Sequence, residues 1–469
     1  MFASEVYTKR RNALRQELKS GLVLLPGNSE AAYNYPANTY TFRQDSNFSY
    51  FFGLENPDLA GVIDLENGVD YIFGNEVDID DIIWMGPQPS MRTKAAQAGV
   101  NNTAPLAELA VFISNLLRMG REVHFVKPYR GETLLQLSDL LGVHHSRISD
   151  YVSLPLIKAI VKLRSIKDKL EISEIEKAVD VAWIMFTEGM KMAYPGIKEQ
   201  TIVGTMEGIS IAYGRPVSFP IILSVNGQIL HNHHHENILK EGRMLVMDAG
   251  AETSLNYASD ITRTVPVGGK FSQRQREIYE IVLAANLNAI SATKPGVFYR
   301  DCHIVACETI ATGLKKLGLM RGDVKEAVAA GAHALFLPHG LGHMLGMDVH
   351  DMEALGQVNV GYDDEIQPST QFGTAYLRMG RRLQPGFVVT NEPGIYFIPE
   401  LIDLWKSENK FAEFINYDRV DEYRDFGGIR IEDDILVTED GCRVLGKPIP
   451  KTVEEIENLM QIKGLREHF

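Results

Sequence analysis

The sequence predicts two domains, an α/β domain over residues 1–165 and an α+β domain over residues 166–469. Three observations carry this prediction. Strand-like apolar runs alternate with helical patterns up to about residue 165. A segment that starts polar and becomes strongly helical begins there. Beyond it, two similar helical hairpins are each followed by strand-like segments. A chain of 469 residues is long enough for two or three domains.

The first 165 residues contain short apolar runs bounded by glycine, acidic residues or asparagine, as sheet strands often are. Apolar residues at helical spacing lie between them. The first 20 residues alternate charged and apolar side chains, which is typical of a surface helix. No catalytic cluster is evident in this part. The expected strands are 21–27, 60–68, 70–74 and 122–126, and the expected helices are 107–120 and 132–142.

The domain boundary is expected near Ser165, just before a long helix. Apolar residues recur there at spacings of three or four, so they share one helix face. The residues of this face are Ile172, Ile175, Val179, Ala182 and Phe186.

A weak internal duplication follows. Residues 187–214 and 286–318 each predict a helix, a Pro-Gly break and a second helix. Each proline can begin the new helix, where its missing N–H would be unpaired in any case. Two related halves that give ligands to one central site would explain why the candidate ligands are far apart in the sequence. Chance similarity of two helical hairpins is the alternative.

Composition and charge exclude several classes of function. The net charge of −14, without a lysine- or arginine-rich block, gives no general attraction for nucleic acid or anionic membranes. No apolar run is long enough to span a bilayer, and the N-terminus has no apolar core of signal-peptide type. The three cysteines, Cys302, Cys307 and Cys442, are too few for a disulfide framework and fit a cytoplasmic location. We expect Cys302 and Cys307 to be small buried residues of a helix.

Four acidic residues and one histidine, spread over the second domain, form a candidate site for two metal ions. Their negative charges would be neutralised by two divalent cations, whereas buried carboxylates alone would tend to protonate. Each is ordinary by itself, since turn aspartates and solvated strand faces are common. The five residues are Asp248, Asp260, His343, Glu392 and Glu432.

Two of these acids lie in strand-like runs joined by a polar segment. If the runs form a hairpin, Asp248 closes the first strand and Asp260 opens the second, so the carboxylates could meet. Alternation puts Thr262 on the face of Asp260, where it could orient the ligating acid. In the last segment, Arg430 and Glu432 share a face by the same alternation. The arginine could steady the glutamate or contact a substrate.

Three histidines, His339, His343 and His350, lie in one glycine-rich segment. Pro338 and the glycines argue against a regular helix there, so only one histidine need be a ligand. The others suit hydrogen bonding to a substrate or an oxyanion, and a stack of buried structural histidines is the alternative. The histidine run 231–237 predicts an exposed loop, of which only His231, next to an apolar stretch, is expected to act. No phosphate-binding loop or nucleophile elbow is present.

With these residues identified, the chain resembles the proline-specific metallopeptidases of the pita-bread fold, aminopeptidase P and prolidase. The resemblance covers nearly the whole chain: residues 42–57 match the N-terminal domain, and all five ligand segments follow in family order. It implies an α/β creatinase-like N-terminal domain that is not catalytic, and an α+β pita-bread catalytic domain with an internal pseudo-twofold repeat.

The resemblance also implies roles for single residues. Asp248 would bind the first metal, Asp260 and Glu432 would bridge both, and His343 and Glu392 would complete the second. The other positions that match are substrate- or intermediate-contacting residues, namely His231, His339, His350, Arg430 and Tyr396.

The sequence also favours one branch of the family, prolidase over aminopeptidase P. A long insertion, 397–427, and the segment before Thr390 look more like eukaryotic-type prolidases than short bacterial aminopeptidases P. Arg378 falls where such prolidases hold the dipeptide carboxylate, which a guanidinium suits; a surface cation is the alternative. We therefore expect Xaa-Pro dipeptides as substrates, with longer Xaa-Pro peptides as the second choice. The spacing of twelve from Asp248 to Asp260 is one longer than expected for these peptidases and predicts a longer or bulged hairpin tip.

The expected cofactor is a pair of divalent metal ions, manganese first, with cobalt or zinc able to occupy the same ligands. The pair would activate a water that attacks the carbonyl before proline. Glu392 would move the proton to the leaving nitrogen, and His350 or His339 would stabilise the oxyanion. A metal-free pita-bread binding module and a metal-free creatinase-type amidinohydrolase are the alternatives. The resemblance also implies a homo-oligomer, a dimer or a tetramer.

Overall fold

The computed structural model describes residues 1–465 and divides into two compact units. The first comprises Met1–Arg164 with Met352–Asn359, and the second comprises Ser165–Asp351 and the chain from Val360 on. The four C-terminal residues of the expected second domain lie outside the described part. Within residues 1–465, no helix combines the length and the apolar character that a bilayer crossing requires.

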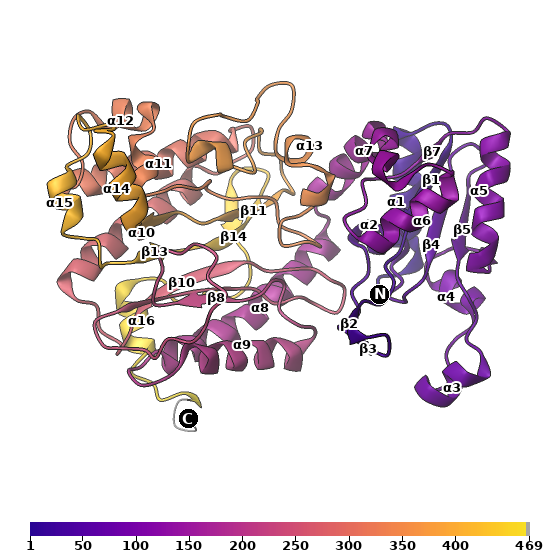
Figure 1. Ribbon diagram of the computed structural model, residues 1–469, viewed down its shortest axis with the longest axis horizontal. Helices are drawn as coiled ribbons and strands as arrows, with labels where there is room; N and C mark the ends of the chain where they lie inside the picture. The colour runs from indigo at the N-terminus through magenta and orange to yellow at the C-terminus, as the bar shows by residue number, and fades with distance from the viewer. Residues whose placement is uncertain (466–469) are drawn as a thin grey trace. The chain divides into compact units, whose positions relative to one another are not determined.

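The first unit is built on a five-stranded mixed sheet in the order β6-β5-β4-β1-β7, drawn in indigo and violet in Figure 1. Strand β1 pairs antiparallel with β4 and parallel with β7, and apolar residues of both faces are buried between sheet and helices. The strands are β1 (Leu22–Pro26), β4 (Ala60–Asp64), β5 (Val69–Phe73), β6 (Asn102–Ala104) and β7 (Val123–His124), with a separate hairpin of β2 (Ala32–Tyr35) and β3 (Asn38–Thr39).

Helices flank this sheet. All four expected strands and both expected helices are present, which confirms the α/β prediction for this part. The short elements β2, β3, β6 and α2 to α4 had not been predicted. The helices are α1 (Ser4–Glu17), α2 (Ser46–Phe52), α3 (Ile79–Met85), α4 (Met91–Gln97), α5 (Leu109–Arg118), α6 (Gly131–Leu141) and α7 (Leu154–Ser165), with short 3-10 turns η1 (Leu106–Glu108) and η2 (His145–Tyr151).

Helix α1 is less superficial than its charge pattern indicates. Arg11 is completely buried, and its guanidinium donates to Asp70 Oδ2 over 2.7 Å and to the carbonyl of Phe51 over 2.7 Å. The helix therefore contributes an ion pair to the interior of the first unit, because a buried arginine must have its charge and its N–H groups satisfied.

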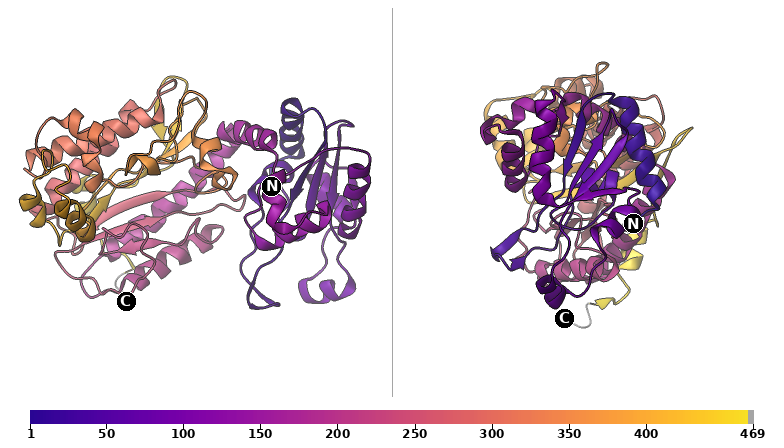
Figure 2. Two further views of the ribbon diagram at one scale, coloured as in Figure 1. Left: turned by 45° about the horizontal axis from the view of Figure 1, so that its top comes forward. Right: turned by 90° about the vertical axis from the view of Figure 1, so that its right-hand side faces the viewer.

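Two helix pairs and three small sheets make the second unit. In the views of Figures 1 and 2, the pairs lie on the outside and the strands lie between them. The longest helix, α8 (Lys169–Met192), begins at a capping box in which Asp168 and Glu171 satisfy each other's backbone N–H groups. The other members of the pairs are α9 (Glu199–Tyr213), α10 (Gln273–Ala292) and α11 (Tyr299–Lys316).

The two hairpins confirm the duplicated helix pattern but correct its turns. The prolines do not open the second helices, because α9 starts at Glu199 and α11 at Tyr299. Each Pro-Gly instead forms the turn between the helices, where Gly196 and Gly296 have φ of +96° and +83°. These are values that glycine adopts without strain.

The strands between the helix pairs form three antiparallel groups, in the orders β10-β9-β8, β11-β14-β15 and β12-β13. An isolated bridge from Thr262 to Glu432 joins the first group to the others. The two halves of the unit therefore meet through the strands that carry the candidate ligands. The strands are β8 (Ile222–Ser224), β9 (Met244–Ala249), β10 (Ile261–Pro266), β11 (Val388–Asn391), β12 (Gly394–Tyr396), β13 (Gly428–Arg430), β14 (Asp433–Val437) and β15 (Cys442–Val444).

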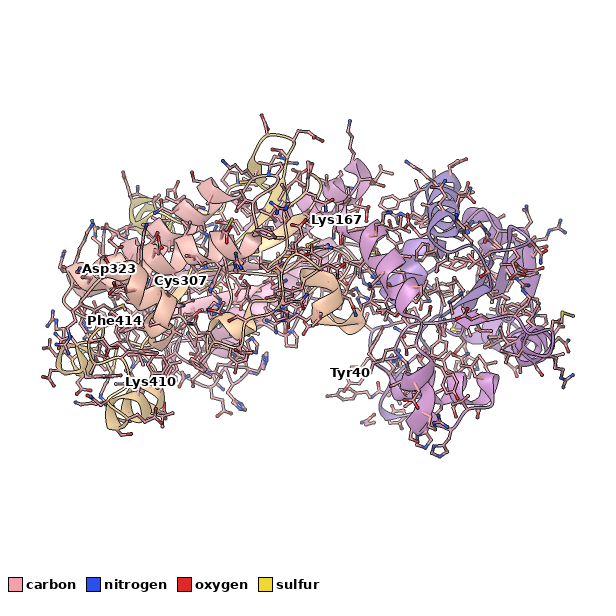
Figure 3. All side chains as sticks on the ribbon, turned by 90° about the horizontal axis from the view of Figure 1, so that it is seen from above. Tyr40, Lys167, Cys307, Asp323, Lys410 and Phe414 are labelled. Carbon is pink, nitrogen blue, oxygen red and sulfur yellow. The ribbon has the colours of Figure 1, made fainter. Side chains whose placement is uncertain are left out.

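The remaining helices are short and lie mainly at the edge of the second unit. The insertion 397–427 contains two of them, and its tip packs near Asp323, with Phe414 O accepting from Arg321 N over 2.8 Å; Figure 3 labels Asp323, Lys410 and Phe414 at this end. These elements are α12 (Val324–Ala330), η3 (Ala332–Leu335), η4 (Glu353–Leu355, in the first unit), α13 (Gln357–Gly361), η5 (Thr374–Tyr376), α14 (Pro399–Ser407), α15 (Tyr417–Asp421) and α16 (Val453–Leu459).

Candidate metal centre

The hairpin that carries Asp248 and Asp260 is regular. Asp248, in β9, pairs with Thr262 in β10, and the pairing continues in register to a bridge between Glu252 and Ala258. Of the two expected alternatives, the hairpin tip is longer rather than bulged, and the extra length lies in a turn over 253–257. Asp260 is the diagonal neighbour of Asp248 on the same face, so the two carboxylates can act together.

The other two acids lie between strands, and the histidine lies in irregular chain. Glu392 lies between β11 and β12, Glu432 lies between β13 and β14, and His343 lies in the segment after η3, tied to β11 by a Met344–Val389 bridge. His343 Nε2 is 3.3 Å from Asp260 Oδ2 and 3.6 Å from Glu392 Oε1. One ligand atom each of Asp260, His343 and Glu432 lies within 4.8 Å of the others.

The tautomer of His343 is set by its surroundings. Its Nδ1 lies 3.0 Å from the carbonyl oxygen of Met344, which can only accept a hydrogen bond. Nδ1 therefore carries the proton, and Nε2 directs a lone pair towards the carboxylates. This is the arrangement of a metal-ligating histidine, in which the second nitrogen is fixed by a hydrogen bond.

The carboxylates of the site are buried close together, which makes their charged forms unfavourable. Burial, followed by repulsion from Asp248, raises the pKa of Asp260 well above its usual value. Burial also raises the pKa of Glu432 strongly and that of Glu392 to about 8. Without added positive charge, burial and mutual repulsion favour the protonated forms of these groups. Asp248 Oδ1 is buried and has no hydrogen-bond partner.

Thr262 links the arginine to a glutamate. Arg430 Nε donates to Thr262 Oγ1 over 3.0 Å, and the same hydroxyl donates to Glu432 Oε2 over 2.7 Å. Arg430 also forms an ion pair with Asp248. These contacts hold the carboxylates of Glu432 and Asp248 in fixed orientations, because each hydrogen bond restricts rotation of the side chain.

A second network had not been predicted. Arg263 Nη1 donates to the backbone oxygen of Glu432 over 2.6 Å, and Nη2 lies 2.7 Å from Asp433 Oδ1. Lys451 Nζ lies 2.7 Å from Asp433 Oδ2. Burial alone would raise the pKa of Asp433, but the two cations hold it below its usual value. Arg263 lies in β10, a strand that is buried on both faces. A buried arginine requires a partner, so this residue was the signal that could have predicted the network.

His339 is held by a chain of hydrogen bonds. Arg430 Nη1 donates to the Tyr396 hydroxyl over 3.0 Å, and that hydroxyl lies 2.9 Å from His339 Nε2. His339 Nδ1 lies 2.8 Å from the Gly340 carbonyl oxygen, so Nδ1 donates and Nε2 accepts. Burial lowers the pKa of His339 to about 3, so the ring is neutral. Both of its nitrogens are engaged. The ring of His350 instead lies against His343, with 4.1 Å between ring centroids.

These side chains line a cavity of about 880 Å³. Ten of the eleven expected site residues border it; the eleventh, Tyr396, is hydrogen-bonded to His339. His231 and the half-buried Arg378 are on its walls; burial, then Arg430, lowers the pKa of His231. His233, which had been assigned no role, also lines it. The apolar walls had not been predicted and include Phe219, Ile222, Leu230, Phe372, Tyr376, Ile398, Leu401 and Leu404.

Known proteins resemble this chain in sequence over most of its length. Residues 173–439 match metallopeptidase family M24, and residues 7–125 match the aminopeptidase P N-terminal domain. The chain is 32% identical over 448 residues to the Xaa-Pro dipeptidase of Homo sapiens, covering 94% of this chain and 88% of that protein. It is 33% identical over 431 residues to a probable Xaa-Pro aminopeptidase of Fusarium vanettenii, covering 89% and 87%.

Solved structures give the same result over the whole length. Pseudomonas aeruginosa aminopeptidase PepP superposes with a TM-score of 0.81 at 28% identity, covering 98% of each chain. Zinc-substituted Escherichia coli aminopeptidase P in complex with product superposes with a TM-score of 0.79 at 29% identity, again covering 98% of each. Because the family model matches more than half of the chain and the relatives cover most of it, the chain belongs to metallopeptidase family M24. It has an aminopeptidase P N-terminal domain ahead of its catalytic part.

Proposed function

We propose that this protein is a hydrolase of Xaa-Pro bonds in peptides with a free N-terminus, working with two divalent metal ions. The observation that carries the proposal is that Asp260, Glu392 and Glu432 gather around His343 in a cavity that Asp248 also lines. The dipeptidase and aminopeptidase names of the relatives support the same chemistry.

The donor set fits such ions. Asp248 offers a buried oxygen with no hydrogen-bond partner, and His343 offers a lone pair towards Asp260 and Glu392. The raised pKa values of Asp260 and Glu432 fit groups that need cations to stay ionised. In this proposal Asp248 would hold the first ion, His343 and Glu392 would hold the second, and Asp260 and Glu432 would be shared between them.

Oxygen-rich ligands with one imidazole suit manganese, and they also accept cobalt or zinc. Such ions, when bound, supply Lewis acidity and lower the pKa of a water towards neutrality. A metal-free binding module or a metal-free amidinohydrolase would have no use for a complete, pre-oriented ligand set, so both alternatives are disfavoured.

The chain's own residues divide the remaining tasks. Glu392 borders the cavity with Oε1 3.6 Å from His343 Nε2, where it is suited to take a proton and return it to the departing proline nitrogen. We assign stabilisation of the oxyanion to His350. His339 had been expected as an alternative, but it accepts a hydrogen bond from Tyr396 and gives its only N–H to Gly340. His339 instead positions Tyr396 and forms part of the cavity wall. We assign contact with the substrate at the rim of the cavity to His231.

The preferred substrate is an Xaa-Pro dipeptide. Arg378 borders the cavity and is half-buried, which suits recognition of a dipeptide carboxylate. Insertion residues Ile398, Leu401 and Leu404, at and in α14, form part of an apolar wall that could receive the proline ring. The aminopeptidase names among the relatives favour longer Xaa-Pro peptides as the second candidate.

The test pairs activity with metal content. Asp260→Asn and Glu432→Gln are each expected to abolish hydrolysis and reduce bound metal, while circular dichroism stays as in wild type. Hydrolysis retained in both variants would overturn the proposal. Comparing kcat/KM for an Xaa-Pro dipeptide with that for an Xaa-Pro-Yaa tripeptide decides the branch.

The division of labour along the chain is also proposed. We assign catalysis to residues 166–469 and a non-catalytic role to residues 1–165. A homo-oligomer, dimer or tetramer, and a cytoplasmic location remain predictions; the latter is supported by three cysteines that form no disulfide.

A further inference from the structure

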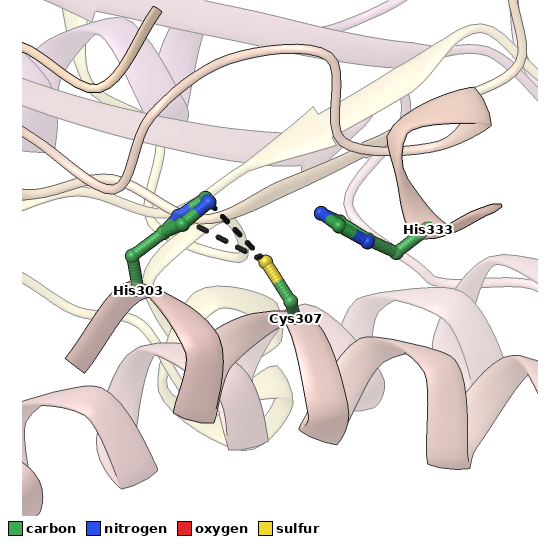
Figure 4. Close-up of side chains that lie close together, drawn as sticks. All are labelled: His303, Cys307 and His333. Atoms are coloured by element: carbon green, nitrogen blue, oxygen red, sulfur yellow. Dashed lines mark hydrogen bonds between the residues drawn. The ribbon is translucent and has the colours of Figure 1, made fainter. Parts of the chain in front are cut away.

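A second cluster of ligand-type side chains lies outside the candidate metal centre. His303 and Cys307 are one turn apart on α11, and His333 faces them from η3 (Figure 4). One ligand atom of each lies within 4.8 Å of the others. Figure 3 places Cys307 among the helices of the second unit. No ligand of the candidate metal centre belongs to this cluster.

The cluster is closed to solvent. Cys307, His303 and His333 are 0%, 1% and 2% exposed. The Cys307 sulfur lies 3.5 Å from His303 Nε2, and the rings of His303 and His333 are 6.3 Å apart, on either side of the thiol (Figure 4). A tetrahedral metal ion with bonds of about 2.0–2.3 Å to nitrogen and sulfur separates those ligand atoms by about the distance between the Cys307 sulfur and His303 Nε2.

A hydrogen bond explains only part of the cluster. The thiol can donate to His303, whereas neither ring nitrogen of His333 makes a hydrogen bond of good geometry, and the Val328 backbone is near enough only to oppose the effect of burial on the pKa of His333. An imidazole that is buried without good hydrogen bonds is unfavourable. The unsatisfied ring is aimed at a sulfur, the softest ligand atom in proteins. An ion shared by all three side chains would satisfy it.

We propose that Cys307, His303 and His333 bind one thiophilic d10 cation, zinc(II) or copper(I). Thiolate and imidazole are the ligands that these ions prefer. Binding breaks the S–H bond of Cys307, forms a sulfur–metal bond and releases the proton to solvent, with no change of oxidation state. One thiolate neutralises copper(I) fully and zinc(II) by half, and an enclosed site favours the smaller residual charge.

The protonation states agree with this assignment. Burial lowers the pKa of His303 to about 3 and that of His333 to about 4, so both rings are neutral and free to ligate at neutral pH. Burial raises the pKa of the Cys307 thiol, so its proton leaves only when a cation replaces it.

The position gives the ion a structural consequence. It would join α11 to η3, whose His333 carbonyl accepts from the N–H groups of Phe336 and Leu337. Phe336 O in turn accepts from Tyr396 N over 2.9 Å. An ion at this place would therefore brace the segment that leads to His339, without touching the reacting atoms.

The experiment isolates the thiolate site from the catalytic ions. The full chain with Asp260→Asn and Glu432→Gln is produced in medium supplemented with cobalt(II) or with copper, because the enclosed site would be loaded during folding. Bound metal is counted by elemental analysis. Cobalt(II) is followed by its thiolate-to-metal charge-transfer band, and copper(I) by competition with a chromogenic chelator. The candidate metal centre has no sulfur ligand, so this band reports only on the second site.

In this background we expect one cobalt(II) or one copper(I) per chain, with the band for cobalt. The further variants Cys307→Ala and His333→Phe should each lose the bound ion and, with cobalt(II), the charge-transfer band. Cys302→Ser is the matched control, because Cys302 is equally buried on the same helix but contacts Thr293 rather than histidine. Which ion is retained identifies the metal. Neither ion bound in the parent, or equal binding in Cys307→Ala, would overturn the proposal. Since the proposal does not rest on peptidase activity, either can fail alone.

Discussion

Lys167 and Asp351, 184 positions apart, form a buried ion pair with 2.7 Å between Nζ and Oδ2 and side chains that are 1% exposed. Lys167 stands just before α8, and Asp351 follows His350 directly. The Asp351 N–H donates to the Met344 carbonyl over 2.8 Å. The pair thus fastens both ends of the segment that carries two site histidines to the start of the long helix.

Lys167→Met is expected to destabilise the second unit by about 3–5 kcal/mol, because it removes the cation that pairs with the buried Asp351 carboxylate. Turnover should also fall, since His350 adjoins the released aspartate. Urea unfolding measures the first effect and steady-state kinetics the second. Lys162→Met is the control: its pair with Glu17 is 66% and 30% exposed, and its loss should cost at most about 1 kcal/mol. Equal losses in both variants would contradict the argument.

Thr262→Val keeps the side-chain shape but removes the hydroxyl between Arg430 and Glu432. We expect metal affinity to fall by about 10–100-fold, as for other residues that orient a ligand. Metal titration of chelator-treated protein gives the change. Thr264→Val is the control on the same strand face, because the Thr264 hydroxyl donates to the Arg430 carbonyl over 2.9 Å and contacts no ligand. Metal affinity unchanged in Thr262→Val would show that Glu432 is held by other contacts.

Much of this architecture follows from local sequence patterns. Period-two and helical spacings identified β1, β4, β5 and β7 and the long helices, because these elements bury an apolar face. The same alternation put Thr262 and Asp260 on one face, and the structure has them so. Pro338 and its glycines correctly excluded a helix around His343, which lies in irregular chain.

Other features depend on distant partners and leave little local trace. The ion pairs of Arg263 with Asp433 and of Lys167 with Asp351 join segments that are far apart in the chain. Neither segment contains a local pattern that indicates its partner. The apolar walls of the cavity come from residues such as Phe219 and Leu404, whose types are ordinary in any core or surface. Cys307 was expected to be a small buried residue, and it is buried; its two histidine neighbours became evident only when η3 was placed beside α11.

Arg378→Ala should weaken dipeptide hydrolysis selectively. A guanidinium–carboxylate contact in a cavity is a charge-assisted hydrogen bond of about 1.5–3 kcal/mol, so KM for an Xaa-Pro dipeptide should rise by about 10–100-fold. A tripeptide carries its carboxylate one residue further on and should be less affected. Arg382→Ala is the control, because Arg382 is exposed and pairs with Glu365. An equal effect of Arg378→Ala on both substrates would favour the aminopeptidase branch.

Acid should destabilise the chelator-treated protein through its buried histidines. His303 and His333 have pKa values of about 3 and about 4, below the value of about 6.5 for an exposed histidine. Between these limits the unfolded chain binds more protons than the folded one, so stability is fully present above pH 7 and falls as the pH drops towards 4. At pH 5 His333 alone should cost on the order of 2 kcal/mol. Urea unfolding at pH 7 and pH 5 should therefore show a smaller pH-dependent loss in His333→Phe than in wild type, whereas His234→Phe, at an exposed position, should match wild type. The same loss in all three proteins would mean that other groups control the acid transition.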